Sequence, residues 1–215
     1  MSNIILAVVG ADKDAEDIIL KSLKDFPSIK ARLITENQHY ANASKIKETL
    51  NRFGIETTIQ KIGNIRNLEE LFVVIKLIKE SEKQHNIIIN VDTDYMSSCL
   101  ALSSAFVNGI QAIGLMEETL IAYPIMKFSY YTALSDKKLL MLNKIYKKKE
   151  YETIESLGKD LKMNLPITAY HINGAPGKIG LEEMGLVETK RSGRKIKVKL
   201  TKLGELLMKG TIEVN

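Results

Sequence analysis

Hydrophobic and polar positions along the first 124 residues alternate between short β-branched runs and longer segments with helical spacing. The short runs predict strands at residues 4–9, 32–34, 56–62, 87–91, 111–114 and 119–124. The longer segments predict helices at residues 11–23, 40–53, 68–78 and 95–107. Strands that alternate with helices are typical of a parallel sheet covered by helices, so this part of the chain is expected to be an α/β domain.

A different pattern begins at Ser135. Three helices are predicted at residues 135–148, 153–160 and 167–172, with Pro166 in the first turn of the third. The segment 173–177 interrupts this third helix. A β-hairpin is then predicted from strands 186–190 and 195–200, and a closing helix follows Thr201. Three helices, a basic hairpin and a closing helix predict a winged helix-turn-helix domain over residues 135–215, with the domain junction at about 125–135.

The positive charge of the chain belongs to this C-terminal part. Residues 135–215 hold 17 lysines and arginines against 10 aspartates and glutamates, a net charge of +7, whereas residues 1–134 carry −2, and the whole chain carries +5. In the second hairpin strand, lysines alternate with Ile196, Val198 and Leu200, so one face can pack while the other meets phosphate. A lysine-rich solvated surface is the alternative interpretation of the charge.

Double-stranded DNA is the partner that this arrangement predicts, because each neutralised phosphate releases condensed counterions. By analogy with other winged helices, the third helix lies in the major groove and the hairpin lies along the adjacent backbone or minor groove. The residues expected near base edges or phosphates are Thr168, Tyr170, His171 and Lys178 from the third helix and its flank, and Arg191, Arg194, Lys195 and Lys197 from the wing. A winged helix that mediates protein contacts instead remains an alternative.

Composition restricts the class of protein further. The 215 residues are 45% hydrophobic, which is ample for a buried core. The single cysteine, Cys99, excludes an intramolecular disulfide and is predicted to be buried on the apolar side of its helix. The N-terminus has no basic leader, and no apolar stretch approaches the roughly 20 residues that span a bilayer. We therefore expect a cytoplasmic protein without a membrane segment.

Ligands of an open parallel sheet gather at the carboxyl ends of the strands, near the switch in strand order. Polar loops follow the first, second and fourth predicted strands. Backbone N–H groups at the start of the helix after strand four are expected to hold an anion, with hydroxyl groups as added donors. The candidate ligand-binding residues are Gly10, Ala11, Asn37, His39, Thr93, Asp94, Tyr95, Met96 and Ser97.

Neither a G-x-G-x-x-G motif nor a P-loop occurs, so no nucleotide cofactor of those classes is expected. Asp92 and Asp94 could in principle hold Mg²⁺ or act as acid and base. Two aspartates at a strand end are more often a helix cap and a surface charge. We therefore expect no metal, no cofactor and no catalytic residue.

The complete chain resembles one known family. Its domain order, the segment LITENQHYANASKIKETLNRFGIE, the polar turn DTDYMSS and the run LPITAYHINGAPGK followed by LEEMGLVE are similar to the archaeal transcription regulators of the CARF (CRISPR-associated Rossmann fold) family. This resemblance implies a Rossmann-like sensor and dimerisation domain over residues 1–126. It also implies a ligand pocket on the dimer axis, formed by Gly10 with Ala11 and by Thr93 to Ser97, in which some family members bind cyclic oligoadenylates.

Together these features predict a homodimeric, DNA-binding transcription regulator that is not an enzyme and is either constitutive or controlled by a cyclic oligoadenylate or another small anionic ligand. The alternatives are an enzyme that cleaves nucleotides through Thr93, Asp94 and Ser97, with an accessory winged helix, and a winged helix that serves as a protein-interaction module. In DTDYMSS, the two carboxylates have no glycine or basic residue beside them. Phosphate binding there requires these carboxylates to point away or to bind a cation.

Overall fold

The structure is a computed structural model that describes residues 2–117, 119–124, 134–193 and 195–212. The chain divides into two compact units, Met1–Tyr130 and Tyr131–Asn215. Arg194 and most of the predicted junction lie outside the described residues. Within the described ranges, no helix combines the length and the apolar character needed to cross a membrane.

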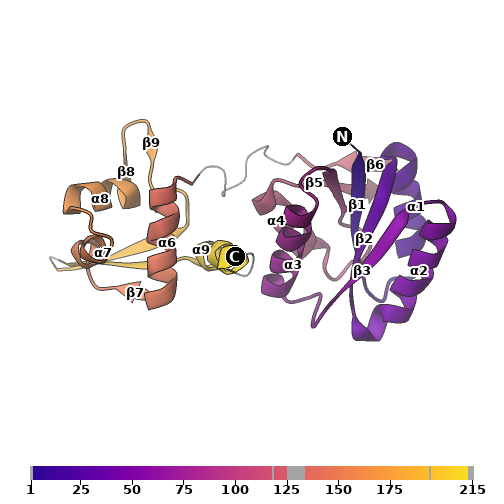
Figure 1. The fold of residues 1–215 in the computed structure, drawn as a ribbon, viewed down its shortest axis with the longest axis horizontal. Helices are drawn as coiled ribbons and strands as arrows, with labels where there is room; N and C mark the ends of the chain where they lie inside the picture. The colour runs from indigo at the N-terminus through magenta and orange to yellow at the C-terminus, as the bar shows by residue number, and fades with distance from the viewer. Residues whose placement is uncertain (1, 118, 125–133, 194, 213–215) are drawn as a thin grey trace. The chain divides into compact units, whose positions relative to one another are not determined.

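A six-stranded sheet forms the centre of the N-terminal unit (Figure 1). Its strands are β1 (Asn3–Val9), β2 (Ser28–Glu36), β3 (Glu56–Ile62), β4 (Asn86–Asn90), β5 (Gln111–Met116) and β6 (Thr119–Ala122). They lie in the order β3-β2-β1-β4-β5-β6. The neighbours from β3 to β5 pair in parallel, as predicted, and β1 pairs with both β2 and β4. The strand order therefore reverses between β1 and β4, which is the switch point of this sheet.

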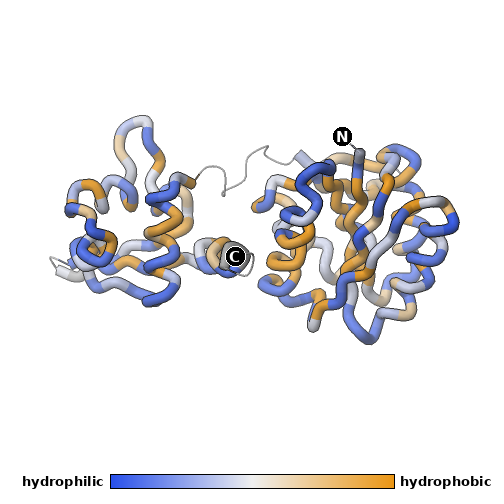
Figure 2. The backbone as a smooth tube through the Cα atoms, in the orientation of Figure 1, coloured by the Kyte–Doolittle hydropathy of each residue, from blue (hydrophilic) through white to orange (hydrophobic). Residues whose placement is uncertain are grey.

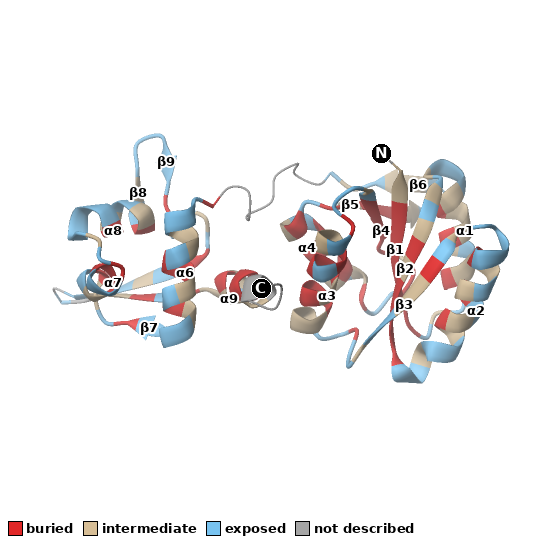
Figure 3. Cartoon of the chain, in the orientation of Figure 1, coloured by how far each residue is buried: buried red, intermediate tan, exposed pale blue. Residues whose placement is uncertain are grey.

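Helices cover both faces of the sheet. α1 (Ala15–Asp25) and α2 (Tyr40–Arg52) lie on one face, and α3 (Leu68–Ser81) and α4 (Ser98–Asn108) lie on the other (Figure 1). A short 3₁₀ helix, η1 (Asn37–His39), precedes α2. In β1, Leu6 and Val8 belong to the core beneath α3 and α4, whereas Ile5 and Ala7 belong to the core beneath α1 and α2. Because both faces are covered, the central strands are continuously apolar and buried (Figures 2 and 3).

Several boundaries in the N-terminal unit differ from the prediction. β6 runs antiparallel to β5 because only two residues connect them, and a parallel crossover needs a dozen or more. α1 and α4 begin at Ala15 and Ser98 rather than at residues 11 and 95, since turns precede them. β2 spans nine residues where three were predicted, because polar side chains interrupt its hydrophobic pattern.

The prediction that Cys99 is buried is wrong, because its side chain is exposed. α4 packs on the sheet through the small residues Ala101 and Ala105, which are buried. At 100° per residue, Cys99 lies on the opposite side of the helix from Ala101. Phe106, seven residues after Cys99, shares its outer face and is 39% exposed. The apolar composition of α4 on both sides concealed which side is buried.

The C-terminal unit contains a three-stranded antiparallel sheet in the order β10-β11-β7 and a separate pair of short strands, β8 and β9. Its elements are α6 (Asp136–Lys148), β7 (Glu150–Tyr151), α7 (Ile154–Asp160), α8 (Leu165–Asn173), β8 (Gly174–Ala175), β9 (Lys178–Ile179), β10 (Val187–Ser192), β11 (Lys195–Leu200) and α9 (Lys202–Ile212). The predicted caps are confirmed: Ser135 accepts the N–H of Lys138 at 3.4 Å, and Thr153 accepts that of Ser156 at 3.0 Å.

The third helix of this unit is longer than predicted. α8 begins at Leu165 because the Asn164 side chain accepts the N–H of Ile167 at 3.0 Å and caps the first turn. The predicted interruption after Ile172 is the small β8–β9 hairpin, which projects beyond the end of α8 (Figure 1). After this hairpin, the Leu181 N–H donates to the His171 carbonyl at 2.9 Å, so the chain again contacts α8.

The paired strands of the β10–β11 hairpin extend further toward its turn than the predicted four-residue tip allowed. Ser192 pairs with Lys195 across this turn, and Gly193 has a φ of +61°, which glycine adopts without strain. Val198 and Leu200 are buried while Lys195 and Lys199 are exposed. The predicted alternation of β11 is therefore confirmed.

Candidate ligand edge and nucleic-acid interface

The loops after β1 and β4 meet at the carboxyl edge of the sheet, at the switch point. A Cβ atom on Gly10 would lie 1.9 Å from Oδ1 of Asp94, so only glycine permits this approach of the two loops. The Tyr95 N–H donates to Oδ2 of Asp12 at 2.6 Å. The predicted residues from these two loops are therefore neighbours in space.

Loops after β2 and β3 join the same edge. The Asn42 side chain donates to the Gly10 carbonyl at 3.2 Å and ties α2 to the loop after β1. Glu36, at the end of β2, is buried, and its Oε1 accepts the Ile65 N–H at 2.8 Å. Asn37 is exposed and His39 is half-buried in η1. Four loops thus contribute to this part of the surface.

The predicted anion donors at this edge are used within the protein. Thr93 and Ser97 are fully buried, and their hydroxyl groups donate to the main-chain oxygens of Asn90 and Asp94. Asp94 is 3% exposed and accepts the Ser97 N–H through Oδ2 at 2.9 Å. The predictions that Thr93, Asp94 and Ser97 bind a ligand directly are corrected, because these side chains form the turn itself.

Other predicted residues remain accessible at the edge. Tyr95 is 81% exposed and Met96 is 54% exposed, and both are residues of the turn that Asp94 closes. Ala11 and Asn37 are also exposed. A ligand here would meet an aromatic ring, a thioether and an amide rather than a ring of N–H groups.

Two exposed cations near this edge escaped the sequence analysis. Lys13 lies in the loop after β1, and Arg66 lies in the loop after β3, next to the Ile65 that Glu36 holds. The available signal was topological, since parallel strands end at the same edge and every loop that follows one contributes to it. Across the described residues, no group of three or more His, Cys, Asp or Glu side chains is arranged to hold a metal ion.

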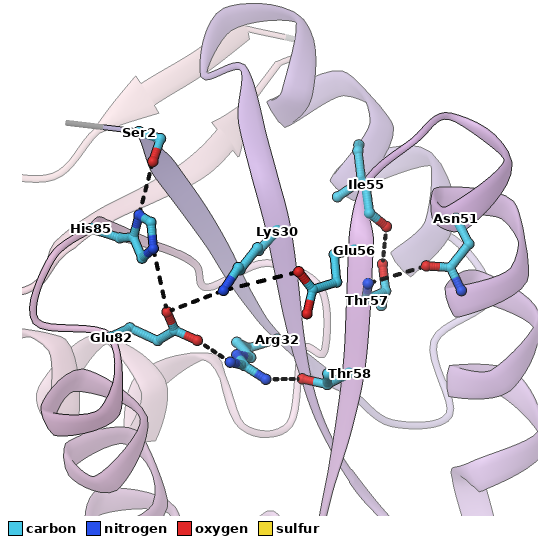
Figure 4. Close-up of polar contacts among 10 residues, drawn as sticks. All are labelled: Ser2, Lys30, Arg32, Asn51, Ile55, Glu56, Thr57, Thr58, Glu82 and His85. Carbon is cyan, nitrogen blue, oxygen red and sulfur yellow. Dashed lines mark hydrogen bonds and ion pairs between the residues drawn. The ribbon is translucent and has the colours of Figure 1, made fainter.

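A separate polar cluster lies between β2, β3 and the end of α3 (Figure 4). Glu82, only 6% exposed, accepts a hydrogen bond from Arg32, and its Oε2 lies 3.8 Å from both Lys30 Nζ and His85 Nε2. Burial opposes ionisation of Glu82, but the hydrogen bond from Arg32 and the surrounding positive charges outweigh it. The pKa of Glu82 therefore lies below its ordinary value. This cluster stabilises the fold and is not part of the carboxyl edge.

An open groove of about 590 Å³ runs along α1 and the end of α2. Its apolar lining comes from Leu20, Leu23, Phe53 and Ile55. None of the predicted ligand-binding residues lines this groove.

The β10–β11 hairpin carries two groups of lysine and arginine side chains, those with a carboxylate salt bridge and those without one. Lys197 Nζ lies 3.0 Å from Glu150 and 2.8 Å from Glu152, and Lys199 Nζ lies 2.8 Å from Glu188. The hydrogen bonds that Lys197 donates to Glu152 and Glu150 raise the pKa of Lys197. The expectation that Lys197 faces DNA is thereby weakened, because its charge already has two partners. The cations at the tip differ, because they are exposed and form no salt bridge with any described residue: Lys190, Arg191 and Lys195. Arg194, the other residue predicted to bind DNA through the hairpin, lies outside the described part of the chain.

The predicted DNA-binding residues on α8 and β9 also differ in their exposure. Thr168 is fully buried against Gly158 of α7, and its hydroxyl donates to the Asn164 carbonyl at 2.9 Å. The prediction that Thr168 lies near base edges is therefore wrong. His171 is half-buried beside Tyr170, and burial together with Lys137 and Lys138 lowers its pKa. Tyr170 is 40% exposed, and Lys178 is exposed on β9.

The N-terminal unit is thus a Rossmann-like α/β domain with a mostly parallel six-stranded sheet, and a small C-terminal α/β region follows it. No family model matches the sequence, and no curated protein matches it either. Solved structures do show the fold. A Type III CRISPR defence DNA nuclease activated by cyclic oligoadenylate is similar with a TM-score of 0.50 and 12% identity over 69% of this chain.

Two further structures cover 97% of this chain at lower similarity. Protein VC1899 from Vibrio cholerae has a TM-score of 0.47 and 10% identity. Can2 from Sulfobacillus thermosulfidooxidans, in complex with cyclic tetra-adenylate, has a TM-score of 0.45 and 9% identity. This chain spans 28% of the nuclease, 64% of VC1899 and 63% of Can2. All three similarities concern the fold.

Proposed function

We propose that this chain is a homodimeric DNA-binding regulator whose N-terminal unit binds a cyclic oligoadenylate. The cationic tip of the β10–β11 hairpin carries the DNA-binding half of the proposal. Lys190, Arg191 and Lys195 are exposed there and form no salt bridge with a described residue, so their charge is available to phosphate. The element order α6-β7-α7-α8-β10-β11 supports a winged helix-turn-helix, in which such a tip follows the DNA backbone.

The ligand half of the proposal is supported by the carboxyl edge of the sheet. Tyr95 projects at the switch point with 81% of its surface exposed, and an aromatic ring in that position can stack on an adenine base. Lys13 and Arg66 supply positive charge near the same edge for a cyclic phosphodiester. The similar fold of a nuclease activated by cyclic oligoadenylate supports the choice of ligand.

Dimerisation through the N-terminal unit is supported by the outer face of α4. Cys99 and Phe106 are exposed on this face, and Met96 adds an apolar side chain just before the helix. A second copy of the unit would cover these side chains and bring two carboxyl edges together.

Isothermal titration of the protein with cyclic tetra-adenylate tests the ligand half. We expect saturable binding by the wild type and a loss of at least tenfold in affinity for Tyr95→Ala, roughly the stacking contribution of one base. Phe53→Ala is the matched control, since Phe53 is an aromatic side chain 68% exposed outside the edge. Absence of binding, or equal loss in both variants, would refute the proposed site.

A nucleotide-cleaving enzyme is the second candidate, and the fold shared with a DNA nuclease is the observation that favours it. The burial of Thr93, Asp94 and Ser97 weighs against the catalytic residues expected for it. Chromatography of the titrated samples separates the two functions. Intact cyclic tetra-adenylate after prolonged incubation supports the regulator, and accumulation of linear products supports the enzyme.

A further inference from the structure

The outer face of α8 is apolar, although this helix occupies the position that reads bases in a winged helix. On this face Ile167 is 41% exposed and Tyr170 is 40% exposed. Leu165, at the N-terminal end of the helix and about 160° around it from Ile167, is 49% exposed. Pro166 and Asn173 are the other exposed residues of the helix. The buried face, with Thr168 and Ile172, packs inward. α8 therefore offers hydrophobic side chains where a charged or amide-rich surface is the usual means of reading bases.

Positive charge flanks this apolar face at both ends. Residues 161–180 contain two lysines, Lys162 before α8 and Lys178 on β9, and no aspartate or glutamate. Both lysines are exposed. The occupant of such a surface carries negative charge at its borders and apolar groups between them. Duplex DNA has this chemistry, because the C5-methyl group of thymine lies in the major groove between two phosphate backbones.

Few side chains on this face can read bases by hydrogen bonds. The Asn164 side chain is already engaged in capping the Ile167 N–H, so its oxygen is unavailable to a base. The first turn of a recognition helix makes most base contacts, and here that turn exposes Leu165, Pro166 and Ile167. Arginine and lysine, which pair with guanine, are absent from α8 itself.

We infer that α8 recognises thymine methyl groups through Ile167 and Tyr170 on its outer face and Leu165 at its N-terminal end, so that the preferred DNA is rich in A·T pairs read from the major groove. This inference rests on the proposed DNA binding. The lysines and the wing supply affinity that is independent of sequence, and the apolar face supplies the preference. Burial of one methyl group corresponds to about 0.8 kcal/mol, which is about a fourfold change in affinity per thymine.

Replacement of thymine by uracil removes the methyl group and leaves base pairing intact, so it isolates the contact. Fluorescence anisotropy would measure binding of the full-length protein to alternating 30-base-pair duplexes of dA-dT, dA-dU and dG-dC at low salt. We expect the dA-dT duplex to bind at least fourfold more tightly than the dA-dU duplex. Ile167→Ser should reduce this ratio toward one, whereas Leu140→Ser, at a 45% exposed leucine on α6, should leave it unchanged.

The possible outcomes distinguish a failure of thymine recognition from a failure of the proposed DNA binding. Equal binding of the dA-dT and dA-dU duplexes would overturn thymine recognition and leave DNA binding in place. Absence of binding to every duplex would overturn DNA binding as well and assign the apolar face to a protein partner. A ratio that persists in Ile167→Ser and in the corresponding Tyr170 and Leu165 variants would place thymine recognition outside α8 and overturn the inference.

Discussion

The turn after β4 and the tip of the β10–β11 hairpin both carry the residue types that bind anions, yet they differ in how their polar groups are used. At the turn, the carboxylates of Asp12 and Asp94 accept main-chain N–H groups, and the buried hydroxyl groups donate to main-chain oxygens. At the tip, Arg191 and Lys195 extend into solvent without an ion-pair partner among the described residues. The polar groups of the turn thus find their hydrogen-bond partners within the protein, whereas the cations of the tip have no ion-pair partner there.

This difference indicates that a polar loop is a binding site only where the fold leaves its groups unsatisfied. Removing the partner of a buried polar group lowers the stability of the fold, whereas removing an exposed cation changes stability very little. Substitutions in the satisfied regions should therefore destabilise a unit. Substitutions at the tip should change binding alone.

Glu82 gives the largest expected loss of stability, since it is a buried carboxylate held by Arg32 and Lys30, with His85 3.8 Å away. Glu82→Gln should lower the free energy of unfolding of the N-terminal unit by about 3 kcal/mol, because Arg32 and Lys30 lose a buried counter-charge. Urea denaturation followed by circular dichroism measures this change. Glu56→Gln is the control, since its side chain is 66% exposed and 4.0 Å from Lys30.

The same residue predicts a pH dependence with a definite sign. Folding lowers the pKa of Glu82, so its contribution is fully present above the ordinary pKa of about 4.3 and is lost as the pH falls through the lower folded value. The wild type and Glu82→Gln should therefore converge in stability below about pH 4. A constant difference down to strong acid would contradict the assignment.

Asp94 comes next. Asp94→Ala removes the carboxylate that accepts the buried Ser97 N–H at 2.9 Å and leaves that N–H only the main-chain oxygen of residue 94 at 3.2 Å. Because a hydrogen bond to a charged group contributes about 1.5 to 3 kcal/mol, the variant should lower the free energy of unfolding by about 2 kcal/mol. Asp94→Asn retains an oxygen acceptor and should recover part of this loss. Thermal denaturation of both variants checks the prediction, and equal stability of Asp94→Ala and the wild type would show that the turn does not depend on its carboxylate.

A smaller effect is expected in the C-terminal unit at Tyr151, which is buried and donates to Oδ2 of Asp160 at 2.8 Å. Burial and this hydrogen bond to Asp160 raise the pKa of Tyr151 to about 12. Its contribution is therefore present below the ordinary value of about 10 and is lost as the pH rises from 10 toward 12. Tyr151→Phe should lower the free energy of unfolding by about 1 kcal/mol at neutral pH. Ultraviolet difference titration should lose one late-ionising tyrosine in the variant.

The comparison can be sharpened within the wing itself. Lys197→Gln removes a cation that forms salt bridges with Glu150 and Glu152, whereas Lys195→Gln removes one that forms no salt bridge with a described residue. We expect the Lys197 variant to weaken DNA binding by roughly twofold or less, and the Lys195 variant to weaken it more. Mobility-shift titrations at one salt concentration rank the two. The reverse order would mean that the ion pairs open on DNA.

Much of the fold was predictable from the chain alone. Continuous apolar runs identified β1 and β4, and the side-chain caps at Ser135 and Thr153 marked where α6 and α7 begin. The direction of β6 and the outer position of Cys99 were missed for different reasons. The strand pattern does not distinguish parallel from antiparallel pairing, and a helix that is apolar all round does not indicate which side is buried.

The candidate sites were predictable in position but not in detail. Proximity of Gly10 and Asp94 followed from the shared edge of parallel strands. The inward side chain of Thr168 and the two carboxylates at Lys197 depend on contacts between distant segments, as with Glu150, 47 residues from Lys197. Such pairings are tertiary, and the local pattern around each residue does not contain them.

The most direct measurement is the salt dependence of duplex binding for the triple variant Lys190→Ala, Arg191→Ala and Lys195→Ala. Each lost phosphate contact lowers the slope of log affinity against log salt by about 0.9, so we predict a slope reduced by roughly 2 to 3 and an unchanged melting temperature. Lys24→Ala, Lys45→Ala and Lys83→Ala together remove the same charge from the N-terminal unit and should leave the slope near that of the wild type. If the tip variant bound with the affinity and slope of the wild type, the wing would not be the nucleic-acid interface.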